Sequence, residues 1–294
     1  MLRETMRWHR RRSDVGAFER PNIAFVMSGG GSLGAMQAGQ LLAVFEAGIV
    51  PDLVIGVSAG ALNGASIAHQ PTVEMAERLS SAWRGLRGVE VFLGSRHERA
   101  WHLLRHHPHL YRADGLVDLV TRFLPLDDLA QLSTPFEAGT VNIDDARVDF
   151  HSTGDPRCIL VASASLPGVF PPVVINGSRH VDGGIAVNLP IQRARDLGAT
   201  LIFAFDCRAG TKHHLPADLS ALGVLTSSIA VAREILTPSH DHPDVVRLPA
   251  PDTQGIGMRD FNHGSRLASA GNELVASFLA QHPELKSLPS CSAA

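Results

Sequence analysis

The chain has 294 residues, of which 45% are hydrophobic and 19% are charged, and its formal net charge is −3. This length and apolar content suit one large domain with a substantial core, and the near-neutral charge argues against nucleic acid as a partner. The three cysteines are too few and too scattered for a disulfide framework or a zinc site.

The N-terminal segment 1–20 is basic but lacks the apolar stretch of a secretory signal. We expect a solvated, mobile arm, with contact to anionic lipid as the alternative. No window approaches the roughly 18 apolar residues of a membrane-spanning helix, which predicts a soluble, cytoplasmic protein whose membrane contact would be peripheral. The expected organisation is this arm, a folded domain over 21–284 and a short tail over 285–294.

Short apolar runs then alternate with helical patterns, which is typical of a single α/β domain with a central, mainly parallel sheet flanked by helices. The continuous apolar run NIAFVMS at 22–28 predicts a strand covered on both faces, and DLVIGVS at 52–58 predicts a second. Apolar residues at helical spacing over 38–49 predict a helix between them. Small residues over 59–70 predict a helix that packs closely against its neighbours.

The rest of the chain continues this alternation. The segment 71–131 is mostly helical in pattern, and 134–154 resembles a hairpin with its turn at Asp144-Asp145. Extended pieces are expected on both sides of Asn176-Gly177 within 167–184 and over 199–207. Helices are expected near 218–236 and 264–281, with DVVRLP at 244–249 between them. No internal repeat or break in composition divides the chain, so one domain fits better than two.

Gly56-Val57-Ser58-Ala59-Gly60 is a G-x-S-x-G pattern that lies directly between an apolar strand and a helix. In a nucleophile elbow, such a turn pushes the serine hydroxyl out above the sheet, and the glycines on both sides let the turn close. The pattern alone is weak evidence for an elbow, because a chain of this composition often contains it by chance. An ordinary glycine-rich turn is therefore the competing interpretation.

The stretch SGGGSLG at 28–34 places several glycines, which have no side chain, at the start of the first helix. Attack on an ester carbonyl creates an oxyanion, and unpaired amides at a helix N-terminus are suited to stabilise it. We therefore predict an oxyanion hole within this glycine-rich stretch. A phosphate-binding loop is the alternative, but the acidic residue expected about 20 positions on and the lysine of a Walker loop are both missing.

Ser58 needs a base, since a free hydroxyl is a poor nucleophile at neutral pH. Fifteen histidines offer candidates, but none stands in a distinctive setting. Asp182 does, because a short extended run delivers its carboxylate into the turn Gly183-Gly184. A carboxylate is a weak base toward a hydroxyl, so proton transfer would have to accompany attack. An aspartate that merely begins a turn or caps a helix is the other interpretation.

Four motifs in order resemble those of the patatin-like phospholipase family, bacterial branch. They are SGGGSLGA at 28–35, GVSAGALNG at 56–64, ASASLPGVFPPV at 162–173 and VDGG at 181–184. The resemblance runs from about residue 22 to 208, and more loosely to 281.

This resemblance implies a Ser-Asp dyad without histidine, with Ser58 as nucleophile and Asp182 as general base, and an oxyanion hole at Gly29, Gly30 and Gly31. It implies hydrolysis of acyl lipids through an acyl-enzyme, by a phospholipase A or lysophospholipase. Supporting motif positions are Gly56, Gly60, Gly183 and Gly184. We expect neither a metal nor a cofactor. The family often has Arg or Lys where this chain has Leu33, which leaves preference for phospholipid over a neutral ester open.

Two rival functions remain at this point. One is an α/β-hydrolase triad of Ser58 with Asp206 and His263, disfavoured because the elbow comes very early in the chain. The other is a catalytically silent lipid-binding module, disfavoured because every dyad and oxyanion position is occupied.

Several other residues invite a function. His102 and His106, within the His-rich segment 97–109, have the i, i+4 spacing of metal ligands, but no acidic third ligand accompanies them. Basic and aromatic residues around them suit either a lipid surface or core packing. His180 would share a strand face with Asp182, although a packed ring is the simpler interpretation. Asn188 and Pro190 resemble positioning residues.

Overall fold

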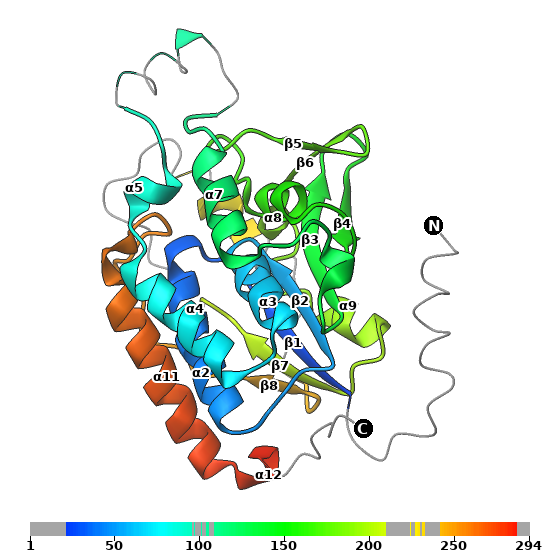
Figure 1. Ribbon diagram of the computed structural model, residues 1–294, viewed down its shortest axis with the longest axis vertical. Coiled ribbons are helices and arrows are strands. Elements are labelled where there is room, and N and C mark those ends of the chain that lie inside the picture. Colours follow the sequence, from blue (N-terminus) through cyan, green and yellow to red (C-terminus); the bar gives the residue numbers. More distant parts are fainter. Residues whose placement is uncertain are drawn as a thin grey trace.

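The structure is a computed structural model that describes residues 22–95, 97, 101, 104, 105, 109–209, 224, 227–229, 231, 232 and 242–286. The expected arm, most of the expected tail and most of the helix expected near 218–236 lie outside these residues. The fold is an eight-stranded sheet in the order β5-β6-β3-β2-β1-β7-β8, with β4 paired to β3 (Figure 1). Its strands are β1 (Ile23–Met27), β2 (Leu53–Val57), β3 (Phe136–Asn142), β4 (Arg147–His151), β5 (Val173–Ile175), β6 (Ser178–Asp182), β7 (Leu201–Phe205) and β8 (Val245–Arg247).

Five strands form the parallel part of the sheet, in the spatial order β3-β2-β1-β7-β8. Every residue of β1 and β2 is buried, as expected for strands covered by helices on both faces. The strands predicted over 22–28, 52–58 and 199–207 are thereby confirmed, and β8 lies within the segment 244–249, for which no strand was predicted.

Helices cover both faces of this sheet. They are α2 (Gly34–Glu46), α3 (Ala59–His69), α4 (Val73–Gly85), α5 (Gly88–Val91), α7 (Asp114–Phe123), α8 (Pro156–Ala164), α9 (Ile191–Asp196), α11 (Gly264–Gln281) and α12 (Pro283–Lys286), with short 3-10 turns η1 (Gly31–Leu33), η2 (Leu129–Gln131), η3 (Gly183–Ile185) and η4 (Phe261–His263). Figure 1 shows α2, α3, α4 and α11 on one side of the parallel strands and α9 on the other. The helices predicted from 38, 59 and 264 onward correspond to α2, α3 and α11.

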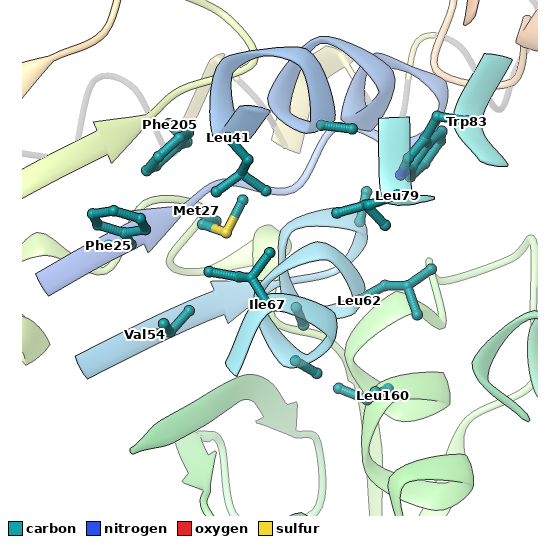
Figure 2. Close-up of a cluster of buried hydrophobic side chains, with 14 of the residues drawn as sticks. Phe25, Met27, Leu41, Val54, Leu62, Ile67, Leu79, Trp83, Leu160 and Phe205 are labelled. Carbon is teal, nitrogen blue, oxygen red and sulfur yellow. The ribbon is translucent and has the colours of Figure 1, made fainter. Parts of the chain in front are cut away.

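The main core lies between the sheet and the layer of α2, α3 and α4. Figure 2 shows side chains from both layers converging there, with Phe25 and Met27 of β1 facing Leu41 and Ile67. Each of these side chains is almost fully buried, and burial of one such side chain contributes about 1.5–3 kcal/mol. A smaller core under α9 covers the other face.

The outer helix α11 lies directly on α2 at two glycines. A Cβ atom at Gly39 would overlap the carbonyl of Ala268, and one at Gly271 would overlap the carbonyl of Met36. The two helices therefore touch at backbone level. This contact holds α2, whose first turn follows the glycine-rich loop.

The antiparallel part of the sheet consists of two hairpins. The β3–β4 hairpin turns at Asp144-Asp145 as predicted, and both amides there donate to the side-chain oxygen of Asn142 at 3.1 Å. The β5–β6 hairpin turns at Asn176-Gly177, where both residues have positive φ. These hairpins bring β6 back against β3.

In the part of the chain that the structure describes, no helix is both long enough and apolar enough to cross a membrane.

Candidate active site

The strand β3 brings the ends of β2 and β6 together. One edge of β3 pairs with β4 from Ala138 to Asn142. A strand has only two edges, so β2 and β6 must share the other one. On that edge Val57 pairs with Gly139, and Asp182 pairs with the next residue, Thr140. Because β2 runs parallel to β3 and β6 antiparallel, their carboxyl ends meet, and Ser58 and Asp182 lie at this junction.

Ser58 occupies a strained turn between β2 and α3. Its φ of 54° and ψ of −125° lie in a region that residues with a side chain rarely adopt. A Cβ atom at Gly56 would overlap the carbonyl of Gly60, and one at Gly60 would lie 2.5 Å from the Met27 oxygen. Both glycines of the G-x-S-x-G pattern are therefore required by close backbone contact, which is the geometry of a nucleophile elbow.

The C-terminal end of α8 holds both sides of the junction. The buried Ser163 hydroxyl accepts from the Ser58 amide at 2.9 Å and donates to the Gly139 carbonyl at 2.8 Å. Two residues later, the Ser165 carbonyl accepts from the Asp182 amide at 2.9 Å. A single short helix thus fixes the backbone at both Ser58 and Asp182.

Asp182 is 5% exposed and ends β6 at the turn η3. One of its carboxylate oxygens accepts from the Gly184 amide at 2.7 Å, so it does cap this turn, as one sequence interpretation held. Gly183 must lack a side chain, because a Cβ atom there would lie 2.5 Å from the carbonyl oxygen of Gly139. The Gly-Gly turn therefore lets β6 reach β3 without obstruction.

The glycine-rich loop lies beside Ser58. A Cβ atom at Gly29 would be 2.9 Å from the Cβ of Ser58 and 2.9 Å from Oδ1 of Asn188. That same oxygen would be 2.9 Å from a Cβ atom at Gly184, next to the Asp182 carboxylate. Asn188 thus links the loop to the aspartate turn, and its Nδ2 donates to the Gly29 carbonyl at 3.3 Å.

Distant segments support this loop from behind. Ser32 donates its amide to the Met258 carbonyl at 2.8 Å and its hydroxyl to the Gly257 carbonyl at 3.0 Å. Cys207 packs beneath Gly30 and donates its amide to the Ser28 hydroxyl at 2.9 Å. Burial raises the pKa of the Cys207 thiol to about 12, so this cysteine is an inert packing group.

Leu33 is buried in the main core and is 5% exposed. Its side chain therefore contributes to packing under the loop in this chain. Nearby, the Trp83 ring stacks on Phe261 with centroids 6.2 Å apart, and a Cβ atom at Gly34 would lie 2.8 Å from the Trp83 ring. The loop and its helix are thus tightly enclosed.

His180 packs in a buried polar cluster on the Asp182 side of the junction. Its Nδ1 lies 2.9 Å from the Thr140 hydroxyl, which also lies 2.8 Å from Nε2 of His151. Burial, followed by the neighbouring His180, lowers the pKa of His151 to about 4, and burial also lowers the pKa of His180. Both rings are therefore neutral at pH 7, in agreement with the packed-ring interpretation.

The residues of the rival triad have other partners. Asp206 forms an ion pair with Arg247 at 3.2 Å, and His263 lies 3.3 Å from Asp260 on its own helical turn. His102 and His106 lie outside the described residues. Among the described residues, no group of three His, Cys, Asp or Glu side chains is arranged to hold a metal ion.

Three further residues of the site, Ser163 and the buried amides Gln37 and Asn63 beneath the loop, are not recognisable from the sequence. Their only signal is a polar side chain among small and apolar helical residues. That signal does not distinguish a positioning residue from an exposed one, because the partners lie up to 168 positions away.

Comparisons with known proteins identify the family of this chain. The family described as patatin-like phospholipase matches residues 25–195. Two similar relatives are fungal lysophospholipases, from Aspergillus terreus at 31% identity over 196 residues and from Coccidioides immitis at 30% over 196 residues. These alignments cover 63% and 64% of this chain but 12% of each relative, so the chain spans about an eighth of their length.

A solved structure shares the fold at low sequence identity. The human GIVD cytosolic phospholipase A2 is 13% identical and superposes with a TM-score of 0.53, over 97% of this chain and 65% of the other. The expected single α/β fold of patatin type is therefore confirmed. Since the family match spans more than half of the sequence, the chain belongs to the patatin-like phospholipase family.

Proposed function

We propose that this protein hydrolyses carboxylic esters of lipids, as a phospholipase A or lysophospholipase, with Ser58 as nucleophile and Asp182 as general base. The main support is the meeting of β2 and β6 along one edge of β3, which brings these two residues to one junction. Family membership and relatives named lysophospholipase support the same class of substrate.

The reaction proceeds in two steps in this proposal. The Ser58 oxygen attacks the ester carbonyl while its proton passes to the Asp182 carboxylate, and the N–H groups of Gly29, Gly30 and Gly31 stabilise the oxyanion. The tetrahedral intermediate expels the alcohol, which takes the proton and leaves an acyl-enzyme. Water then attacks the acyl-enzyme and gives its proton to Asp182, the second tetrahedral intermediate releases the fatty acid, and the Ser58 oxygen takes the proton back from Asp182.

A serine-directed fluorophosphonate probe and a panel of lipid esters test the proposal. Wild-type protein should label and turn over, whereas Ser58→Ala should abolish labelling and lower hydrolysis by at least about 10⁴-fold. Asp182→Asn should be nearly as damaging. Labelling that persists in Ser58→Ala would contradict the assignment of the nucleophile.

His263→Ala and Asp206→Asn are the matched controls, because they remove the rival base and acid without touching the junction. Both should retain wild-type kcat within about twofold, because the His263 side chain is 40% exposed and Asp206 pairs with Arg247, away from the junction. A large loss in His263→Ala would instead favour a triad. The same panel, which includes phospholipids, lysophospholipids and neutral glycerides, decides the head-group preference that Leu33 leaves open.

We also propose peripheral contact with anionic lipid through the segment around Trp101. The Trp101 and Leu104 side chains are 53% and 74% exposed, and the Arg105 guanidinium lies 4.4 Å from the Trp101 ring centroid. Exposed aromatic and aliphatic groups beside a cation suit a negatively charged bilayer interface.

The test is sedimentation with phosphatidylglycerol vesicles, with phosphatidylcholine vesicles for comparison. Trp101→Ala combined with Leu104→Ala should lower vesicle binding about tenfold and leave hydrolysis of a soluble short-chain ester unchanged. Leu274→Ala, which removes an exposed leucine from α11, is the control. Equal binding by all three proteins would overturn the proposed contact.

A further inference from the structure

Three consecutive carbonyl groups of the glycine-rich loop, those of Ser28, Gly29 and Gly30, each accept a hydrogen bond. Gln37 Nε2 donates to the Ser28 oxygen at 2.8 Å, and Asn188 Nδ2 donates to the Gly29 oxygen at 3.3 Å. The Leu33 amide donates to the Gly30 oxygen at 3.2 Å. The described peptide bonds are all trans, so the N–H of each following residue points away from the tied carbonyl.

The corresponding N–H groups have no hydrogen-bond acceptor among the described residues. They belong to Gly29, Gly30 and Gly31, the three residues predicted to stabilise an oxyanion. Unpaired amides are unusual in a folded chain, where backbone donors are almost always satisfied. The loop is therefore built to keep three donors available.

A chain of buried amides determines the orientation of Gln37. An indole N–H can only donate, so the 2.7 Å bond from Trp83 Nε1 requires the side-chain oxygen of Asn63 as acceptor. Asn63 Nδ2 must then donate to Gln37 Oε1, at 3.0 Å, and Gln37 Nε2 must face the carbonyls of Ser28 and Phe205. Because Gln37 and Asn63 are fully buried, water cannot replace any partner in this chain of hydrogen bonds.

Asn188 is held in place by the element that follows it. The helix α9 begins at Ile191, and its Arg193 donates two 2.7 Å bonds to the Glu137 carboxylate on β3. The Asn188 oxygen packs between Gly29 and Gly184, so its NH₂ group faces the Gly29 carbonyl, which can only accept.

We propose that Gln37 and Asn188 are positioning residues that hold the Ser28 and Gly29 carbonyls away from the reacting oxygen and thereby aim the Gly29 and Gly30 N–H groups at it. The inference rests on the proposed hydrolase function. It answers a physical need, because glycine has few conformational restraints and a flipped peptide would present a carbonyl oxygen to the oxyanion.

The decisive variant is Asn188→Leu, which keeps the branched shape and removes the donor. On a soluble p-nitrophenyl ester we expect kcat to fall about 10- to 100-fold with KM nearly unchanged, because only the transition state carries the oxyanion. Gln192→Leu on α9 is the control, since its amide donates only to the exposed Asp196 carboxylate among the described residues. It should retain wild-type kcat.

A pair of inhibitors distinguishes a specific loss of oxyanion stabilisation from a general disturbance of the active site. An alkyl trifluoromethyl ketone adds to a serine oxygen and forms an oxyanion, whereas the matching methyl ketone binds without this step. Asn188→Leu should weaken the trifluoromethyl ketone about 10- to 100-fold and leave the methyl ketone unchanged. Wild-type affinity for both inhibitors together with wild-type kcat would overturn the inference.

Gln37→Met and Asn188→Ala keep the test valid if Asn188→Leu does not fold, which thermal melting reports. A folded variant of either kind should show the same selective loss, and equal loss for both ketones would count against positioning. Wild-type protein that neither labels with fluorophosphonate nor cleaves any ester would overturn the proposed function itself. An active wild type beside an equally active Asn188→Leu overturns only the positioning role.

Discussion

The two glycine-rich turns are built differently, although both join a buried strand to a helix. The turn at Ser58 closes on itself, because Gly56 lets the Gly60 carbonyl approach, and Gly60 lets the same turn touch the carbonyls of Met27 and Ser28. The loop at 28–34 depends on partners far away in the sequence. Gln37 lies close by, but Asn188, Cys207 and Met258 are more than 150 residues distant.

This difference separates two requirements of the proposed chemistry. A nucleophile needs one exposed hydroxyl, and a strained turn between strand and helix supplies it locally. Oxyanion donors need several amides with a shared direction, and a glycine loop cannot hold that direction by itself. Long-range hydrogen bonds therefore fix the direction of the loop amides, whereas backbone strain in the turn exposes the serine hydroxyl.

The largest effect should come from Gly60→Ala, which places a methyl group at the contact between the two turns. The added Cβ would lie 2.5 Å from the Met27 carbonyl oxygen and 2.6 Å from that of Ser28. We expect unfolding to become easier by about 3 kcal/mol or more, together with loss of fluorophosphonate labelling. Denaturant titration measures the first and gel fluorescence the second. A stable, reactive Gly60→Ala would mean that the turns are not locked together.

Gly31→Ala should affect the loop alone. Gly31 has a φ of +58°, and an added Cβ would overlap the carbonyl of Met258. We expect kcat to fall about 100-fold, because the loop must shift away from Met258, and stability to fall by about 1–2 kcal/mol of backbone strain plus the cost of this overlap. Steady-state kinetics beside thermal melting measures both. A variant whose stability collapses before its activity would show that this loop is part of the folding core.

Ser163→Ala tests whether the elbow is as self-contained as its glycines indicate. The variant removes the hydroxyl that bridges the Ser58 amide and the Gly139 carbonyl. We expect a loss of about 1–3 kcal/mol in unfolding free energy and about tenfold in kcat, because two buried backbone groups lose their partner. Ser163→Thr keeps the hydroxyl and is the control. Unchanged kcat in Ser163→Ala would place the support of Ser58 in the turn alone.

The smallest effect on activity is expected for His151, whose Nε2 lies 2.8 Å from the Thr140 hydroxyl and whose titration changes stability. The pKa of His151 is about 4 in the folded protein and near 6.5 when unfolded, so the folded state resists protonation. Its contribution to stability is complete above pH 6.5 and is lost as the pH falls toward 4, by about 2 kcal/mol at pH 5. His151→Gln should flatten this part of the stability profile measured by urea titration. An equal slope in both proteins would assign the acid sensitivity to other groups.

Much of the architecture could be predicted from the pattern of residues. The continuous apolar run of β1 indicates a strand covered on both faces, and Asp144-Asp145 and Asn176-Gly177 mark turns, because these signals are local. Ser58 and Asp182 could be singled out for the same reason, since each follows an extended run and enters a glycine turn. The burial of Leu33 could not be predicted in this way, because it depends on the packing of segments around η1.

The order of strands and helices, the glycine-flanked turn at Ser58 and the glycines at 29–31 can be read from residues that are close together in the sequence. That β2 and β6 share an edge of β3, and that Gln37 and Asn188 donate to adjacent carbonyls, follows from the packing of the folded chain. The two groups of features differ in how far apart along the sequence the interacting residues lie. Glycine and apolar periodicity act through local sterics and burial, whereas a hydrogen bond between residues 29 and 188 leaves no periodic trace in the sequence.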